Sequence, residues 1–516
     1  MKKSIRILAA ALCLGLVLSA PAMAADALTI SVTGGSEDSM QLNSATSGYL
    51  NGLSALRHLY EGLYKLDETG TPVLGQASSV DISEDMMTYT FTLRDDITWS
   101  DGKSVTSADF IFGWDNLAAQ GGDYSSLISD ICTSYEAPDE KTIVMHLAFP
   151  CAYVPAILAF PSTVPARQDY VEQYGDAYGT DPDKSVYNGP FQMTDWQHEA
   201  EVTLELRDDY YDADKLSVGT IHWILTSEER TALASFESGD LVYSDMCPDE
   251  EQPRMAGNGL FYVPGNNNYC VMFNLGEKGN EVLKDARVRK ALSLTIDRNR
   301  VMAIRDMNDE IGKTLACSGY VNADGVDFTD YAPAWYNTED YEGNCEEAKA
   351  LLAEAGYEGG AGFPHLSYIV NNDSRQEIAE AVVNDWKEIL GIDSITVEKV
   401  ENFSAARRGG DYDLAYYGWY MDYTDLSNMF GCFVNTQNSN SFYYNEAYDA
   451  EYDAAISTSD QAEQWEHYAA CEKILSEDLP VAVILHSMNS YLFNDYEYDG
   501  LVYSCGNFVF TYLQAK

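Results

Sequence analysis

Alternation of apolar and polar residues is clearest over residues 88–93, which read TYTFTL. Three threonines alternate there with a tyrosine, a phenylalanine and a leucine, which is the period-two pattern of a strand with one buried face. Asp101-Gly102 then predicts a tight turn, because glycine adopts a positive φ without strain. Thr106 is a candidate helix N-cap, with Asp109 favourably placed near the helix dipole. The segment Asp85–Asn116 therefore predicts a strand, a turn and a helix in succession.

Apolar residues also recur at helical spacing further along the chain. The pattern predicts helices over Asp285–Ile304, Asn344–Ala355, Ser374–Leu390 and Ala462–Ser476. Asn344 with Glu347 is a plausible capping box, and Gly356 is a natural stop. The third helix aligns its apolar residues on one face, which favours core packing over a cofactor site. Because strands and helices alternate throughout, a mixed α/β architecture is expected.

The first 24 residues have the pattern of an export signal. A positively charged start precedes an apolar run and a small-x-small cleavage site; these parts are Lys2, Lys3 and Arg6, then Ile7–Ser19, then Ala22–Ala24. No later segment reaches the roughly 18 apolar residues that a membrane span needs. We expect a chain that is secreted across the cytoplasmic membrane, soluble, and periplasmic or associated with the cell surface. The remaining length allows two or three domains.

Net charge narrows the possible partners. The formal net charge of the whole chain is −51, and cleavage of the signal would remove only positive charges. This balance argues against binding to nucleic acid or to anionic lipid. Hydrophobic residues make up 46% of the chain, which excludes a disordered acidic protein.

Enzymatic chemistry finds little support in the motifs. The sequence has no HExxH, GxSxG, P-loop or GxGxxG after a strand, and its seven histidines lack metal-ligand spacing. Residues 322–327 faintly resemble a calcium loop but lack its terminal glutamate, so a turn is the better interpretation. We therefore expect no enzyme, no cofactor and no metal site.

The cysteines do not define a disulfide framework. Ten cysteines are present and none forms a CxxC pair. Nine follow the predicted signal, and an odd number leaves at least one thiol unpaired in a monomer. Export would permit disulfides, but the sequence assigns none. Cys270 and Cys432 are one possible pair.

The segment 415–423, AYYGWYMDY, is the strongest candidate for a functional site. Leu414–Trp419 reads as a buried strand that ends at a loop. Gly418 there would let a ligand backbone approach closely, and Trp419 offers an apolar wall. Asp422, poorly solvated at the mouth, would pair strongly with a cation. The alternative is a structural aromatic strand that ends at a capping aspartate.

Several of these motifs resemble the peptide/nickel-type solute-binding proteins that serve ABC importers. The segment Asp85–Asn116 is similar to that family's strand, tryptophan-x-aspartate-glycine turn and alanine-aspartate-phenylalanine helix. Further similar blocks follow in the family's order across almost the whole mature chain; they are 58–63, 187–191, 285–292, 345–356 and 412–419. Among the members, oligopeptide-binding proteins resemble this chain most.

The resemblance implies a two-lobed α/β fold of the periplasmic-binding-protein type, class II-like, with an additional domain in the first lobe. By analogy lobe I would be discontinuous and comprise residues 25–62, 185–266 and 486–516. The extra domain would span 63–184 and lobe II would span 267–485, after a signal peptide at 1–24. Hinge strands would join the two lobes.

The resemblance also assigns roles at one end of the ligand. The glycine-tryptophan-x-x-aspartate-tyrosine string, which ends at Tyr423, is similar to that of oligopeptide binders. In that family the aspartate pairs with the peptide α-ammonium, a role that falls here to Asp422. Gly418 and Tyr420 would offer main-chain hydrogen bonds, and Trp419 would line a side-chain pocket.

The carboxylate end and two other positions depart from the family pattern. Arg407 aligns with a family arginine near the pocket, and Arg375 lies where oligopeptide binders carry a histidine that helps to bind the carboxylate; either could equally be an ordinary surface residue. Three further family residues are replaced, by Tyr416, Val400 and Ser47-Gly48. Asn267 and Tyr420 stand where some relatives have a pair of half-cystines.

The function expected is that of an extracytoplasmic receptor for an ABC importer. It would be a monomer that captures short peptides by their backbone and α-ammonium and delivers them to the membrane permease. The alternatives are another solute on the same scaffold (a dipeptide only, a metal chelate, haem or a sugar) or, more remotely, a secreted enzyme or a surface interaction protein.

Overall fold

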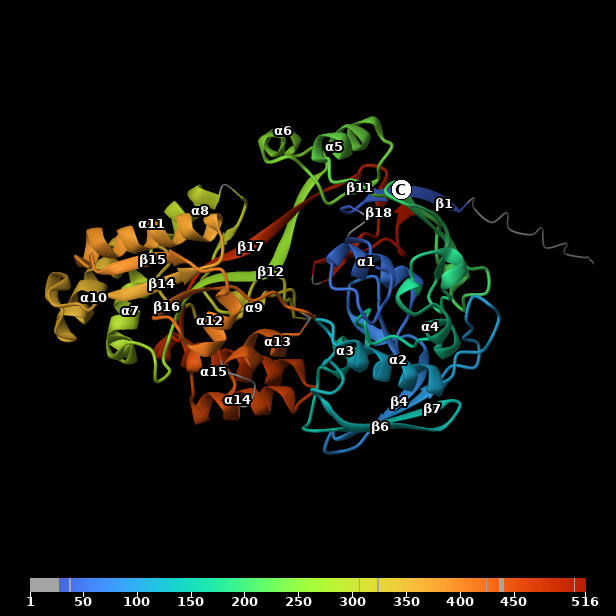
Figure 1. Cartoon of the computed structure of the whole chain (residues 1–516), viewed down its shortest axis with the longest axis horizontal. Coiled ribbons are helices and arrows are strands. Elements are labelled where there is room, and N and C mark those ends of the chain that lie inside the picture. Colours follow the sequence, from blue (N-terminus) through green and yellow to red (C-terminus); the bar gives the residue numbers. More distant parts are fainter. Residues whose placement is uncertain are drawn as a thin grey trace, which may run out of the picture.

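The computed structural model describes residues 27–36, 39–305, 307–322, 324–423, 425–435, 440–504 and 506–516. Figure 1 shows two bodies joined by two long strands, β12 (Leu260–Phe273) and β17 (Val481–Phe493). The names lobe I, extra domain and lobe II are kept below for the residue ranges given above, whose bounds stay a prediction. The predicted signal lies outside the described residues.

One 11-stranded sheet runs through both bodies, because β12 and β17 pair with each other and also with strands on either side. On the lobe II side the order is β15 (Ile395–Lys399), β14 (Leu366–Val370), β16 (Leu414–Tyr417), β12 and β17. On the lobe I side it continues through β11 (Tyr243–Ser244), β1 (Leu28–Thr33), β10 (Val218–Ile224), β9 (Glu201–Leu206) and β8 (Phe191–Gln197), while β13 (Glu310–Ile311) pairs with β17 off this path. The mixed α/β architecture is confirmed.

The ladder between β12 and β17 is irregular near its middle. Its register shifts between Pro264 and Asn268 and again between Tyr269 and Cys270. Asn266 has a φ of 53°, a left-handed conformation that asparagine tolerates better than most residues. The paired strands therefore bend where the chain passes between the bodies.

Two of the four predicted helices are confirmed and two need correction. Helices α11 (Asp373–Leu390) and α15 (Gln461–Asp478) match the prediction closely. The stretch predicted as one helix is two, α7 (Ala286–Leu294) and α8 (Arg298–Arg305), because the Asp297 main-chain N–H is held by the Asp385 carboxylate. Helix α10 (Tyr341–Glu354) begins at an Asp340 cap, so the predicted Asn344 cap is wrong.

The remaining helices are distributed over both bodies (Figure 1). In lobe I and the extra domain they are α1 (Leu50–Leu59), α2 (Ser107–Gln120), α3 (Val154–Leu158), α4 (Gln168–Tyr174), α5 (Glu229–Ser238) and α6 (Gln252–Met255). In lobe II they are α9 (Phe328–Tyr331), α12 (Phe403–Gly409), α13 (Ser427–Phe430) and α14 (Glu446–Ile456).

A separate 4-stranded sheet in the extra domain contains the strand predicted from residues 88–93. Its order is β4 (Ala77–Ile82), β5 (Thr88–Leu93), β7 (Thr142–Leu147) and β6 (Cys132–Asp139). Gly102 has the expected positive φ of 82°. Thr106 and Asp109 form a reciprocal capping box at the start of α2. The strand, turn and helix are all confirmed.

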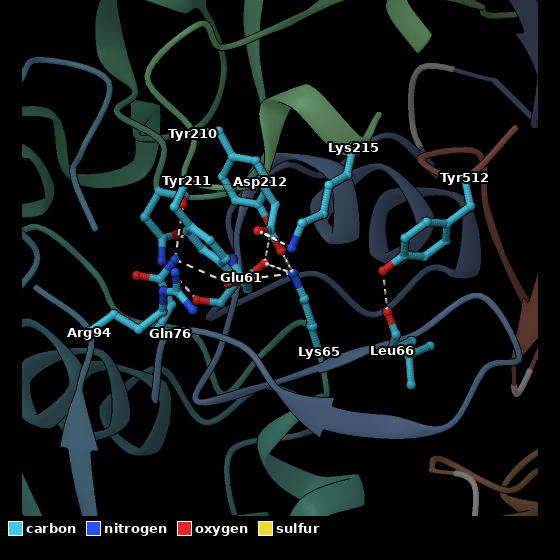
Figure 2. A network of polar contacts seen from close by, with 12 residues as sticks. Glu61, Lys65, Leu66, Gln76, Arg94, Tyr210, Tyr211, Asp212, Lys215 and Tyr512 are labelled. Carbon is cyan, nitrogen blue, oxygen red and sulfur yellow. Dashed lines mark hydrogen bonds and ion pairs between the residues drawn. The ribbon is translucent and has the colours of Figure 1, made fainter. Parts of the chain in front are cut away.

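A buried polar network joins the extra domain to lobe I (Figure 2). The Glu61 carboxylate accepts hydrogen bonds from the hydroxyls of Tyr210 and Tyr211, both at 2.5 Å, and from Gln76 at 3.2 Å. The Lys65 ammonium donates to both tyrosines and to the Asp212 carboxylate. The adjoining cavity holds only about 50 Å³. The members satisfy most of one another's hydrogen-bonding groups, with the Gln76 Oε1 as an exception, and we interpret the cluster as structural.

Eight cysteines fall within the described residues and none of them is in a disulfide, so the possible bridge between Cys270 and Cys432 is absent. Burial raises the pKa of the Cys270 thiol above its usual range. Within the same described ranges no helix is both long and apolar enough to cross a bilayer. No cluster of three or more potential metal ligands occurs there either.

Candidate functional site

A cavity of about 270 Å³ lies between the two bodies and contains Asp422 in its wall. Every part of the fold contributes to its lining: Gly48, Leu50, Leu53, Gly506 and Asn507 from lobe I, Tyr124 and Phe160 from the extra domain, Gly265 and Asn266 from β12, and Tyr420, Met421 and Asp422 from lobe II. Tyr124 and Phe160 pack at 4.7 Å between ring centroids and form an aromatic wall. A ligand in this cavity would therefore touch both bodies at once.

Asp422 is a half-buried carboxylate that has no cationic partner among the described residues. Burial raises its pKa, the nearby negative charge of Asp123 raises it further, and a hydrogen bond from the Asn428 side chain opposes the shift. Taking a carboxylate out of water without a compensating cation is costly. An ammonium group in the cavity would remove that cost, so the arrangement suits a positively charged ligand atom.

Asn428, in α13, positions Asp422. Its Nδ2 donates to the Asp422 Oδ2 at 3.4 Å. Its Oδ1 accepts hydrogen bonds from the Trp419 Nε1 at 2.8 Å and from the Asp422 main-chain N–H at 3.3 Å. The Asn428 side-chain amide thus fixes the positions of both the Asp422 carboxylate and the Trp419 indole. No sequence pattern points to Asn428, because its role depends on a turn that brings α13 back beside the strand.

Packing inside the protein explains why residue 418 is a glycine. A Cβ at this position would lie 2.8 Å from the main-chain oxygen of Asn268 and would also collide with the Tyr416 hydroxyl. Strand β16 ends at Tyr417, two residues earlier than predicted. Close packing therefore requires glycine here whether or not a ligand approaches.

The two predicted pocket residues that follow Gly418, Trp419 and Tyr420, have different surroundings. Trp419 is half-buried against the core. Tyr420 keeps 59% of its surface exposed and lines the Asp422 cavity. It forms an antiparallel bridge with Asn267, so the two positions where some relatives carry half-cystines do face each other.

Tyr423 is absent from the lining of the Asp422 cavity. Its ring stacks on Tyr153 of the extra domain, with centroids 5.5 Å apart and an interplanar angle of 11°. Nearby, the Ala152 main-chain N–H donates to the carbonyl of Ile456 at 2.8 Å. Lobe II and the extra domain are thus in contact away from β12 and β17. Tyr423 holds this contact, and its predicted ligand role stays untested.

Arg375 lies at the start of α11 above two tyrosines. It donates to the hydroxyls of Tyr269 at 3.2 Å and Tyr416 at 3.3 Å. Its buried Nε has no hydrogen-bond partner, and no carboxylate pairs with it among the residues the structure describes. Arg305, which the sequence did not single out, donates to the same Tyr269 hydroxyl at 2.6 Å but is neutralised by Asp309. Arg375 therefore has charge available for an anion.

Arg407 is not brought together with Arg375. Its guanidinium lies 5.8 Å from the ring centroid of Tyr417, whereas Arg375 contacts Tyr416. Neighbouring residues of a strand point to opposite faces of the sheet. The two arginines predicted for the carboxylate end therefore lie on opposite sides of β16 and do not form one anion site.

Asp123 is a second carboxylate near the cavity, and no sequence pattern points to it. It lies in a loop after α2, and its carboxylate is 2.7 Å from the position that a Cβ on Gly48 would take. Gly48 thus leaves room for a carboxylate beside the cavity. Only the folded chain reveals this contact, because the two residues are far apart in sequence.

A cavity enclosed by two lobes that are joined by paired strands is the arrangement of a solute-binding protein. The family model for bacterial extracellular solute-binding proteins, family 5 (middle region), matches residues 71–441. The chain belongs to this family.

Similar proteins share most of their length with this chain. The oligopeptide-binding protein OppA of Bacillus subtilis is 27% identical over 83% of this chain and 82% of its own. The periplasmic oligopeptide-binding protein OppA of Salmonella typhimurium is 28% identical over 84% and 83%.

Solved structures agree with the fold. The substrate-binding domain of an oligopeptide ABC transporter from Bacillus anthracis has a TM-score of 0.68 at 25% identity, over 95% of this chain and 99% of its own. The unliganded open form of the murein tripeptide-binding protein MppA has a TM-score of 0.78 at 24% identity, over 92% and 94%, and shows the likeness of fold alone. The two-lobed periplasmic-binding-protein-like fold expected from the sequence is confirmed.

Proposed function

We propose that this protein is an extracytoplasmic receptor that captures short peptides between its lobes and delivers them to the permease of an ABC importer. One observation carries the proposal: a half-buried carboxylate, Asp422, lines a cavity shared by both bodies and lacks a cation among the described residues. Membership of family 5 and the oligopeptide-binding names of the relatives support peptides as the solute.

The peptide α-ammonium is the group that fits Asp422. A charge-assisted hydrogen bond to an ammonium would replace the water that the half-buried carboxylate has lost. The second carboxylate, Asp123, lies next to the cavity-lining Gly48 and adds attraction for a cation. Peptide main-chain groups would then hydrogen-bond to the backbone beside Tyr420. Such bonds do not depend on the side chains of the peptide.

The other end of the peptide is assigned to Arg375. Its Nε is buried without a partner, and the two tyrosine hydroxyls hold its guanidinium in place. A carboxylate can accept two parallel N–H bonds from such a fixed guanidinium. Arg375 contacts Tyr416, in the same strand that leads to Gly418, and this contact supports a role for Arg375 at the other end of the peptide.

Calorimetric titration with one tripeptide in three forms tests this proposal. The form with both ends free should bind tightest. Acetylation of the N-terminus should weaken binding most, by roughly 30-fold or more, because it removes the cation for Asp422. Amidation of the C-terminus should weaken binding less, because Arg375 is partly exposed to solvent. Equal affinities for the free and acetylated forms would remove the assigned role of Asp422, and no binding of any form would contradict peptide capture.

Binding should also depend on pH in a defined direction. Burial and Asp123 raise the pKa of Asp422 in the unliganded protein, so the carboxylate takes up its proton at a higher pH than an exposed aspartate does. An ammonium binds the ionised form. Peptide affinity should therefore fall as pH drops through the raised pKa and level off above it.

Proton release checks this expectation directly. A bound ammonium lowers the pKa of Asp422, so binding near that pKa must release protons. Calorimetry in two buffers with different ionisation enthalpies would measure the release. Proton uptake on binding, or an affinity that rises toward acid pH, would contradict the assignment.

A further inference from the structure

A second cavity, of about 290 Å³, adjoins the one that contains Asp422. It is lined by aromatic residues of lobe I, by hinge-strand residues and by polar groups of β11 and α1: Thr33, Gly34, Leu50, Asn51, Ser54, Trp223, Tyr243, Asp245, Met307, Met488, Asn489, Ser490, Gly506, Phe508 and Phe510. Leu50 and Gly506 also line the first cavity, so the two are neighbours that share a wall.

Two buried polar atoms in this second cavity have no partner. They are the Oδ1 of Asp245 and the Nε1 of Trp223, both out of contact with solvent. Buried polar groups in folded proteins are nearly always hydrogen-bonded, so the unpaired Asp245 oxygen is open to a donor from a ligand, whereas the Trp223 N–H needs an acceptor such as a water or a peptide carbonyl. Neither atom is part of the Asp422 site.

Asp245 is the only charged residue among the described residues that line this cavity. Burial raises the pKa of its carboxyl to about 7, with a hydrogen bond involving Asn51 opposing the shift. No lysine, arginine or histidine lies in the described lining. The carboxyl is therefore a buried acid that lacks the cation which would stabilise its ionised form.

The walls around Asp245 favour a cation with a long apolar stem. Tyr243 packs against Phe508 and Phe510, with centroids 4.8 and 5.0 Å apart, and Trp223 packs edge-on against Phe510. Aromatic faces attract ammonium and guanidinium groups, and they also pack against the methylene stem that carries such groups. Met307 and Met488 add flexible apolar surface that adapts to side chains of different shape.

We propose that this cavity is a specificity subsite for a basic side chain, lysine or arginine, of the bound peptide, with Asp245 as its counter-charge. The inference rests on the proposed peptide-binding function and adds the side-chain class that this chain selects. The cavity that would hold the peptide at Asp422 adjoins this second cavity, because Leu50 and Gly506 line both, so a side chain of the bound peptide would extend past these two residues into the second cavity. Acidic side chains are disfavoured there, because two carboxylates would face each other without a cation between them.

A matched peptide set tests the subsite. Tripeptides with free termini would carry lysine, norleucine or glutamate at one position at a time, and affinities would be measured by calorimetry for the wild type and for Asp245→Asn. At one position the wild type should bind the lysine peptide about tenfold or more tighter than the norleucine peptide. Asp245→Asn should lose that preference while binding the norleucine peptide as the wild type does. Asp249→Asn, an exposed carboxylate four residues away, should keep the preference.

Each result decides a different claim. If peptides bind but lysine is favoured at no position, the basic subsite is wrong and the proposed function stands. If Asp245→Asn weakens all peptides equally, Asp245 is structural and the subsite is again wrong; the melting temperature of the variant shows whether the fold is intact. If the wild type binds no peptide, both proposals are wrong. If N-acetylation weakens binding but lysine is preferred at no position, the proposed function stands and the basic subsite is wrong.

Discussion

Replacing Asp422 by asparagine should weaken the binding of peptides with free N-termini by roughly 30-fold or more, which corresponds to about 2 kcal/mol or more. The substitution removes the charge that pairs with the α-ammonium and leaves that ammonium buried without a partner. The melting temperature should not fall. Burial raises the pKa of Asp422, so its ionised form destabilises the unliganded protein above that pKa, and a neutral amide avoids this cost. Calorimetry and thermal unfolding at neutral pH measure the two effects.

Asp81→Asn is the matched control, because Asp81 is exposed on β4 and the change removes the same charge far from the cavity. It should leave peptide affinity unchanged. If both variants lost affinity equally, the effect would come from the overall negative charge of the protein. If Asp422→Asn unfolded at a much lower temperature, Asp422 would have a structural role instead.

Replacing Glu61 by alanine should destabilise the protein by about 3–5 kcal/mol. The change leaves the hydroxyls of Tyr210 and Tyr211 without their acceptor and leaves Lys65 with one carboxylate partner fewer (Figure 2). Glu61 is buried, and its hydrogen bonds join the extra domain to lobe I. Urea unfolding followed by circular dichroism measures the loss as a lower midpoint.

Glu68→Ala provides the comparison for Glu61. Glu68 is an exposed glutamate in the turn seven residues later, so its removal should change the urea midpoint little. Peptide affinity of the Glu61 variant, measured well below its midpoint, should stay near that of the wild type, because the network lies outside both cavities. A large loss of affinity with an unchanged midpoint would mean that the network acts on the binding site.

The fold was predictable wherever a pattern is local. The threonine alternation before Asp101 and the Thr106 cap depend only on neighbours in sequence, and both are confirmed. Asn344 was a reasonable cap by residue type, but Asp340 caps α10 four residues earlier. The break between α7 and α8 depends on Asp385, which lies far along the chain, so no local pattern could reveal it.

The candidate site was predictable on one wall only. The string from Gly418 to Asp422 carries recognisable residues, and Tyr420 and Asp422 do line the cavity. The opposite wall consists of ordinary residues such as Leu50, Tyr124 and Phe160, whose types say nothing about ligands. Asp245 was hidden for a related reason: in a chain with 82 acidic residues, a carboxylate becomes informative only when its surroundings are known.

The irregular stretch of β12 lies both where the two bodies are joined and in the wall of the cavity. Gly265 and Asn266 lie where the register of the β12–β17 ladder shifts, and both also line the Asp422 cavity. The Asn266 carbonyl accepts the Met421 main-chain N–H at 3.0 Å, directly beside Asp422. A bound solute would therefore contact the same few residues at which the connection between the lobes bends.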